Sequence, residues 1–198
     1  MALLIFAVLS LLVAGELQAG VVVGGTRFIF PADRDSISIS LTNTSQESWL
    51  INSKINRPTR WVGGEASTVP APLLAAPPLI LLKPGTTGTL RLLRTESDIL
   101  PVDRETLFEL SIASVPSGKV ENQSVKVAMR SVFKLFWRPE GLPGDPLEAY
   151  QQLRWTRNSQ GVQLTNPTPY YINLIQVSVN GKALSNVGVV PPKSQRQT

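Results

Sequence analysis

The stretch that decides the fold is residues 125–139, Val-Lys-Val-Ala-Met-Arg-Ser-Val-Phe-Lys-Leu-Phe-Trp-Arg-Pro. In an extended strand, successive side chains point to opposite faces, so every second residue lies on the same face. One face of this stretch carries Val125, Val127, Met129, Ser131 and Phe133. The other face begins with Lys126, Ala128 and Arg130. The alternation predicts a β-strand over 125–137 whose apolar row must be covered by another layer.

The alternation ends at Lys134, which is followed by three large apolar residues, Leu135, Phe136 and Trp137. One interpretation is an ordinary sandwich strand whose lysine extends along its apolar neighbours and reaches water. The other interpretation is a strand lent to another protein, with the lysine as an anchor. The pattern alone favours the ordinary sandwich strand.

The chain begins with a segment that resembles a secretory signal peptide. Residues 2–14 are nearly all apolar, and a small residue, Ala19, lies at the expected cleavage position. The apolar run is too short to cross a bilayer, which requires about 20 residues. We therefore expect residues 1–19 to be removed, with export of a mature chain that starts at Gly20 and does not insert into a membrane.

The chain has 198 residues and a formal net charge of +5 at pH 7, with Lys and Arg scattered along it. A nucleic-acid partner would favour clustered basic residues, so this charge instead favours acidic or carboxylate-bearing protein partners. The sequence contains no Cys and no His. These absences exclude Ser-His-Asp and Cys-His nucleophiles and the common His-bearing zinc sites. We expect no catalytic residues, no metal and no cofactor, which disfavours an exported hydrolase.

The hydrophobic pattern of residues 20–139 is all-β. Residues 36–42 alternate polar and apolar side chains without a fault, as in a strand with one solvent-exposed face. Further strands are expected at 49–51, 79–82, 90–92 and 108–112. Short strands separated by Pro, Gly and Asn turns predict an immunoglobulin-like β-sandwich. The Ala- and Pro-rich segment 69–78 fits no strand and is expected to be a surface loop.

A Pro- and Gly-rich segment, 140–146, is expected to link this sandwich to a second unit, 147–198. Asn180-Gly181 predicts a tight hairpin in the second unit. Strands are expected there at 153–155, 162–164 and 172–179. The unit has about half the length of a sandwich, which would leave an apolar face and strand edges exposed. The sequence is therefore expected to be truncated, unless something else completes the unit.

Four segments resemble motifs of the periplasmic pilus chaperones of the chaperone–usher pathway. Residues 134–139, Lys-Leu-Phe-Trp-Arg-Pro, resemble the signature K-L-F-Y-R-P, with Trp137 in place of Tyr. Residues 26–31, Thr-Arg-Phe-Ile-Phe-Pro, resemble the first strand of the family. Residues 100–108 resemble L-P-x-D-R-E-S-x-F, and residues 166–171 match N-P-T-P-Y-Y. Because the four agree in order and spacing, the sequence is identified as a member of this family.

The resemblance implies two immunoglobulin-like domains arranged as a boomerang, 20–139 and a shortened 147–198. It implies a periplasmic (fimbrial) chaperone that binds pilus subunits and delivers them to an outer-membrane usher. Each subunit lacks its last strand, and the chaperone lends one by strand addition, a mode of which chaperone–pilin pairs are themselves a known example. The short interval between Pro116 and Val125 resembles the short-loop subgroup of the family.

The resemblance also implies roles for individual residues. Val125, Val127 and Met129 would enter the subunit groove, where each fully buried side chain contributes about 1.5–3 kcal/mol. Arg27 and Lys134 would bind the C-terminal carboxylate of the subunit and so fix the strand register. Without the resemblance, the three apolar residues would simply face their own partner sheet, and Arg27 would be a surface arginine.

Glu105 and Arg138 match positions that share a salt bridge at the domain cleft of the family. As an ordinary surface pair they would contribute under about 1 kcal/mol. In the family, an acid near the C-terminus completes this network, and this sequence ends before that position. The alternative assignment is a pilus subunit or adhesin. Subunits usually carry a disulfide and an apolar N-terminal extension, whereas this chain has no Cys and an internal donor-like strand.

Overall fold

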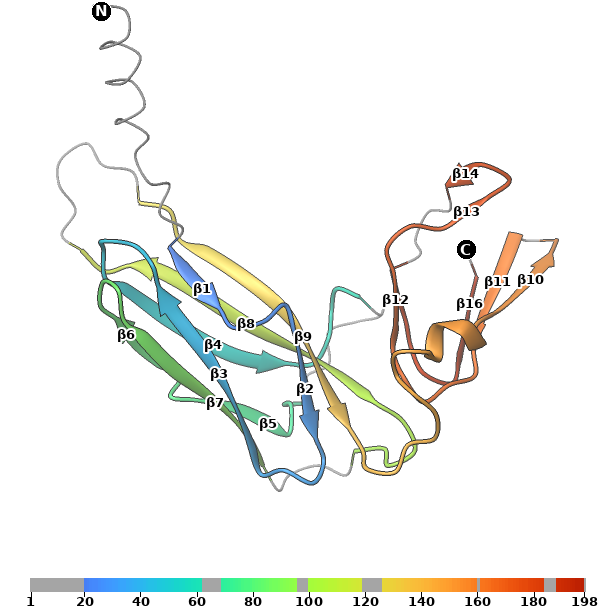
Figure 1. Cartoon of the computed structure of the whole chain (residues 1–198), viewed down its shortest axis with the longest axis horizontal. Coiled ribbons are helices and arrows are strands. Elements are labelled where there is room, and N and C mark those ends of the chain that lie inside the picture. The colour runs from blue at the N-terminus through green and yellow to red at the C-terminus, as the bar shows by residue number, and fades with distance from the viewer. Residues whose placement is uncertain are drawn as a thin grey trace, which may run out of the picture.

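The computed structural model describes residues 20–61, 69–95, 100–118, 126–159, 161–183 and 188–197, so the segment expected to be a signal peptide lies outside it. Figure 1 shows strands that form a larger and a smaller unit, joined at an angle. One helical turn, η1 (Ala149–Gln152), occurs in the described residues. The all-β prediction is confirmed. In the described ranges, no helix has the length and apolar character that crossing a bilayer requires.

The larger unit is a sandwich of two sheets, as the alternating strands predict. The first sheet has the order β1 (Val21–Val23), β3 (Ser36–Asn43), β7 (Thr87–Arg94) and β5 (Leu73–Ala76). The second sheet has the order β2 (Arg27–Pro31), β9 (Met129–Arg138), β8 (Thr106–Pro116), β4 (Trp49–Asn56) and β6 (Leu79–Leu82). β2 runs parallel to β9, whereas β8 runs antiparallel to it. The N-terminal segment therefore contributes one strand to each sheet.

The core of the larger unit lies between the two sheets. In β3, Ile39 and Leu41 are buried, whereas Ser40 between them is exposed. β7 repeats this pattern with Leu90 and Leu92, which join the same cluster. Full burial of one such side chain contributes about 1.5–3 kcal/mol. The facing apolar rows thus hold the sandwich together in a chain without cysteine.

The expectation of a surface loop over 69–78 is wrong. Residues Leu73–Ala76 form β5, which pairs with β7 at the edge of the first sheet. Leu73 and Ala75 are buried, so this short strand covers one end of the core. Alanine and neighbouring prolines give a weak strand signal, but an edge strand tolerates them because only one of its sides is paired.

In its described residues, the smaller unit has its own core and three short sheets. One sheet has the order β10 (Arg154–Asn158), β11 (Gly161–Asn166) and β16 (Ser194–Gln197). The other two are the pairs β12 (Ile172–Leu174) with β15 (Gly188–Val190), and β13 (Ser178–Val179) with β14 (Lys182–Ala183). The buried residues of this core are Ala149, Leu164, Tyr170, Ile172 and Val190.

The hairpin predicted at Asn180-Gly181 is confirmed. Both residues have positive φ angles, 51° and 77°, as a two-residue type I′ turn requires, and Val179 pairs with Lys182. The single strand expected over 172–179 is wrong, because β12 ends at Leu174 and β13 begins at Ser178. The apolar pattern runs through both strands and does not reveal that β12 pairs with β15 while β13 pairs with its own hairpin partner.

Candidate functional site

β9 has two neighbouring strands along one half and one along the other. Residues 134–138 pair with β2 on one side, and β8 pairs with β9 from Trp137 back to Met129 on the other. Among the described residues, 129–133 therefore pair with β8 alone. The unpaired N–H and C=O groups of such an edge are a template for a further strand. Figure 1 shows β2 beside the lower part of β9.

This edge is open because the N-terminal segment changes sheets. β1 pairs with β3 in the first sheet, and only after Gly24 and Gly25 does the chain join β9 as β2. The Gly24 N–H donates to the Ser40 carbonyl oxygen at 2.9 Å. A Cβ on Gly24 would lie 2.3 Å from Ser40 Oγ, so a larger residue at this position would force the Ser40 hydroxyl to move. β1 is thereby held away from residues 129–133.

Two of the three predicted groove residues lie at this open edge, and both are exposed. Met129 begins β9 and is 61% exposed, and Val127 is 62% exposed. Val125 lies outside the described residues. The prediction that the strand extends over 125–137 is wrong at its start, because β9 begins at Met129 and 126–128 form no strand. The ladder with β8 ends at Met129, and continuing its register would set residue 127 against Pro116, which has no N–H to donate.

The row that contains Met129 continues into the core of the larger unit. Phe133 is half-buried, and Leu135 and Trp137 are buried in the cluster between the sheets. Trp137 stacks on Phe30 of β2, with 5.3 Å between the ring centroids. The same alternating face is therefore covered at one end of the strand and bare at the other.

Arg27 and Lys134 are register partners in the parallel pair of β2 and β9. They lie at the point where β2 begins, directly after the open edge. Arg27 is exposed and Lys134 is half-buried. Burial lowers the pKa of Lys134, and the neighbouring Arg27 charge lowers this pKa further. Neither cation forms an ion pair with an acidic side chain in the described ranges, so an incoming carboxylate would find two adjacent positive charges.

Lys134 is surrounded by two groups that the sequence does not single out. Its Nζ donates a hydrogen bond of 2.7 Å to Oδ1 of Asn173 in the smaller unit. Its Nζ also lies 5.2 Å from the ring centroid of Trp61, a distance at which a cation is attracted to an aromatic face. Both contacts join segments far apart in the sequence, which explains why strand periodicity gives no sign of them.

Glu109 of β8 holds in place the segment that carries Trp61. It is the register partner of Lys134 in β8 and is only 5% exposed. Its Oε1 accepts hydrogen bonds from the backbone N–H groups of Thr59 at 2.8 Å and Arg60 at 3.0 Å. The carboxylate thus fixes the segment that leads to Trp61. The alternation of residues 108–112 indicates which face Glu109 lies on, but not that this face is covered there.

Glu105 and Arg138 meet where the two units join. Arg138 Nε donates to Glu105 Oε1 at 2.7 Å, and Glu105 is only 3% exposed. The second carboxylate oxygen of Glu105 accepts from the backbone N–H of Tyr171 at 2.8 Å. The Arg138 guanidinium also lies 5.5 Å from the ring centroid of Tyr170. One carboxylate therefore links the larger unit to Tyr171, directly before β12 of the smaller unit.

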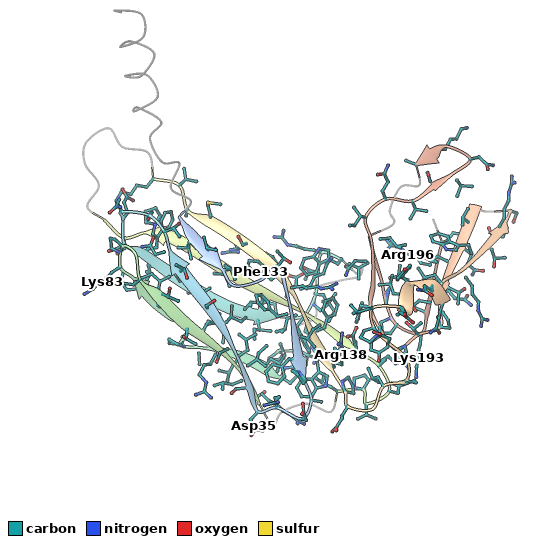
Figure 2. All side chains as sticks on the ribbon, viewed as in Figure 1. Asp35, Lys83, Phe133, Arg138, Lys193 and Arg196 are labelled. Atoms are coloured by element: carbon teal, nitrogen blue, oxygen red, sulfur yellow. The ribbon has the colours of Figure 1, made fainter. Side chains whose placement is uncertain are left out.

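An ion pair joins the two units at the surface. Lys193 Nζ lies 2.7 Å from Asp103 Oδ2, and Arg104 contacts the same carboxylate at 3.0 Å. The hydrogen bonds from Arg104 and Lys193 hold the pKa of Asp103 well below its usual range. Figure 2 places Lys193 near Arg138 at the joint. Because these groups are exposed, solvent screens the pair.

The turn of the smaller unit at the joint is organised by Asn166. Its Nδ2 donates to the Tyr170 carbonyl oxygen at 2.8 Å, and its Oδ1 accepts from the backbone N–H of Thr168 at 3.0 Å. The Pro169 carbonyl oxygen accepts from the Glu105 N–H at 2.9 Å. The segment 166–171 thus presents its backbone to the larger unit.

A cavity of about 350 Å³ lies in the angle between the two units. Its lining includes Arg27, Glu105, Arg138, Tyr171 and Asn173. The cavity therefore brings together one of the two predicted anchor cations and both members of the predicted salt bridge. Met129 and Val127 do not line it, because they lie further along β9.

Comparison with known families agrees with this architecture. Residues 20–143 match the model of the pili and flagellar-assembly chaperone, PapD N-terminal domain, and residues 148–198 match that of the pili assembly chaperone PapD, C-terminal domain. The chain belongs to the PapD family of pilus-assembly chaperones. It is therefore a fimbrial chaperone, and the alternative of a pilus subunit or adhesin is excluded.

Individual relatives of this chaperone agree with the family. The chain is 98% identical over 198 residues to the uncharacterized fimbrial chaperone YcbF of Escherichia coli K12, a match that covers all of this chain and 84% of that protein. It is 32% identical to the chaperone protein FimC of Escherichia coli K12, over 94% of this chain and 76% of FimC.

Solved structures of related chaperones share its fold. One is the Salmonella enterica SafA pilin in complex with the SafB chaperone, with a TM-score of 0.77 and 31% identity, covering 92% of this chain and 84% of that chain. Another is the YadV chaperone, with a TM-score of 0.73 and 30% identity, covering 90% of this chain and 83% of that one. Both matches extend over both units of this chaperone.

Proposed function

We propose that this chaperone binds fimbrial subunits by adding its open β9 edge to them, with Arg27 and Lys134 holding the C-terminal carboxylate of the subunit. The observation that carries the proposal is the change of neighbours along β9. An unpaired edge ends at two adjacent cations, and the strand that closes the edge begins with one of them. Strand addition supplies affinity through backbone hydrogen bonds and specificity through alternate side chains.

The exposed apolar residues support the subunit-binding part of the proposal. Met129 lies on the row that enters the core at Leu135 and Trp137, and Val127 lies two residues before it. Each would contribute about 1.5–3 kcal/mol if a subunit buried it. Val125 would extend the row by one further position. Met129 suits a surface that serves several subunits, because its unbranched side chain adapts to irregular grooves.

The two cations support the anchor. Arg presents a two-pronged donor and Lys a compact charge, and both are suited to a carboxylate. Because Lys134 is half-buried beside Arg27, its charge is disfavoured in the free chaperone. The negative charge of an arriving carboxylate would offset both the cost of burial and the repulsion from Arg27. The SafA–SafB complex is a chaperone–pilin pair on a similar fold.

The wider assignment follows from the same family. We infer that 20–139 and 147–198 act as two domains joined by 140–146, and that the Glu105–Arg138 pair helps to set the angle between them. Residues 1–19 would direct export, so the chaperone would act in the periplasm. It would deliver its subunits to an outer-membrane usher and require no cofactor.

Co-expression with a fimbrial subunit that aggregates alone tests the proposal. The mature chaperone should yield a soluble 1:1 complex, measured by co-purification and size-exclusion chromatography. Arg27→Ala and Lys134→Ala should each reduce the affinity roughly tenfold or more, since a hydrogen bond to a charged group contributes about 1.5–3 kcal/mol.

Arg34→Ala and Lys54→Ala are the matched controls, because both residues are exposed cations of the larger unit away from the open edge. They should leave the yield of complex unchanged. Wild-type yields from both Arg27→Ala and Lys134→Ala would overturn the anchor.

A further inference from the structure

Asn173 approaches the two cations from the smaller unit. Its Oδ1 accepts the 2.7 Å hydrogen bond from the Lys134 ammonium, and its side chain lines the same cavity as Arg27. Lys134 does not line that cavity. Asn173 is therefore the group through which the Lys134 ammonium is connected to the cavity. Asn173 therefore contacts the Lys134 ammonium and faces the cavity that Arg27 also lines.

The backbone fixes the position of Asn173. It is the central residue of β12 and pairs with Val189 of β15. Two residues earlier, the Tyr171 N–H donates to the Glu105 carboxylate, which fastens the start of this segment to the larger unit. Side chains two residues apart in a strand share a face, and Ile172 between them is buried in the smaller core. Asn173 is thus held toward the larger unit.

The amide has the donors that a carboxylate needs. An Asn side chain offers a carbonyl acceptor and two N–H donors, whereas an ionised carboxylate only accepts. The Asn173 oxygen is used by Lys134, and no hydrogen bond from its nitrogen is found among the described residues. A carboxylate placed between Arg27 and Asn173 would accept from both while the amide oxygen keeps its bond to the ammonium.

We propose that Asn173 is a positioning residue of the carboxylate anchor, with its Oδ1 holding the Lys134 ammonium and its amide N–H groups binding the chain-terminal carboxylate of the subunit. The inference rests on the anchor assigned to Arg27 and Lys134 under the proposed function. It adds the smaller unit to subunit recognition. A C-terminal amide at the same place would present an N–H group to the donors of Asn173 and Arg27, so the site selects a free carboxylate.

Asn173→Asp is the most informative substitution. It replaces the amide N–H groups with a second carboxylate oxygen, and the new charge would pair with Lys134 and repel the carboxylate of the subunit. Asn180→Asp is the matched control, because it adds the same charge to an exposed hairpin of the same unit. Asp-Gly also suits a type I′ turn, so the control preserves the fold.

The probe is a dye-labelled peptide of alternating valine and threonine, made with a free C-terminal carboxylate and, separately, with a C-terminal amide. Fluorescence anisotropy gives its affinity for the mature chain and each variant. We expect the wild type and Asn180→Asp to prefer the carboxylate peptide equally. Asn173→Asp should bind this peptide at least about tenfold more weakly and lose the preference, given the strength of hydrogen bonds to charged groups. Asn173→Ala should fall between them.

Titration of the lysine side chains by NMR measures the pKa of Lys134. This pKa should not change if Asn173 only supports the fold. Asn173→Asp should raise the pKa of Lys134, because it sets a negative charge beside the ammonium, whereas Asn180→Asp should not change it. Equal binding of the two peptides by the wild type would overturn the carboxylate anchor and this inference with it. If the wild type prefers the carboxylate peptide, and Asn173→Asp binds it with the same affinity and the same preference, the carboxylate anchor stands. The role of Asn173 in it would then be overturned.

Discussion

The two halves of β9 belong to one strand and differ in what lies beside them. Residues 134–137 have β2 on one side and β8 on the other, and Leu135 and Trp137 are buried. Residues 129–133 have β8 alone within the described ranges, and Met129 is mostly exposed. The alternation of side chains is continuous through both halves. The neighbours of β9, rather than its own sequence, therefore decide which half is closed.

This difference separates two roles along a single strand. The closed half is held by backbone hydrogen bonds on both sides and by the core, so its side chains contribute to the stability of the chain. The open half leaves apolar surface in water, and the transfer free energy of that surface is released only when a partner covers it. Stability and subunit affinity should therefore respond to substitutions at different positions of β9.

The largest effect on stability is expected in the closed half. Leu135→Ala should lower the free energy of unfolding by about 2–5 kcal/mol, because it removes a fully buried side chain and leaves a cavity. Met129→Ala, in the open half, should change it by less than about 0.5 kcal/mol. Urea unfolding followed by tryptophan fluorescence measures both. Similar losses for the two variants would show that the halves are not distinct.

The next effect concerns subunit affinity in the open half. Met129→Asp should weaken subunit binding by at least about tenfold, because it removes an apolar contact and places a charge in an apolar groove. Urea unfolding should be nearly unchanged. Arg130→Asp places an acid on the adjacent exposed residue of β9, on the opposite face, so it should bind almost as the wild type does. Equal losses from both variants would argue against a one-sided apolar contact.

The smallest effect is a pH dependence at the boundary between the halves. The pKa of Lys134 is lowered from 10.5, mainly by burial and further by Arg27, so the unfolded chain binds the proton more tightly than the folded chain. Below the lowered pKa the penalty for the buried charge is fully present, and it is relieved as the pH rises from the lowered pKa toward 10.5. Subunit binding should change in the opposite direction, because the anchor loses its charge.

Lys134→Met isolates this contribution. The difference in unfolding free energy between the wild type and Lys134→Met should shift in favour of the wild type as the pH rises toward 10.5. A difference that is independent of pH would contradict the lowered pKa.

Strict alternation made most strands of the larger unit predictable. β3 lies where its alternation places it, because one face of the strand meets the core. β6 does not alternate and was located by its short apolar run, which ends at a Lys-Pro-Gly turn. The pattern does not predict β5, because this strand forms through pairing at a sheet edge and its alanines give little strand signal. β12 and β13 were merged because a continuous apolar run does not record a change of sheet.

The site was predictable to the extent that it follows strand register. Arg27, Lys134, Glu105 and Arg138 were found through the family motifs, and the structure places each pair together. Trp61, Glu109 and Asn173 were not found, because they meet Lys134 from a loop, a neighbouring strand and the smaller unit. A buried acid in register with a half-buried lysine is visible only once β8 and β9 are aligned.

The early start of β2 sets a limit on what can be added to the sheet. From Lys134 onwards, β2 occupies the edge of β9, and five register pairs would have to separate before another strand could pass. The beginning of β2 thus sterically blocks an added strand. It does so at the same position along β9 where Arg27 and Lys134 would bind the carboxylate. An added strand that continued past this point by one residue would collide with the backbone of β2. The fold therefore limits how far along β9 one end of an added strand can reach.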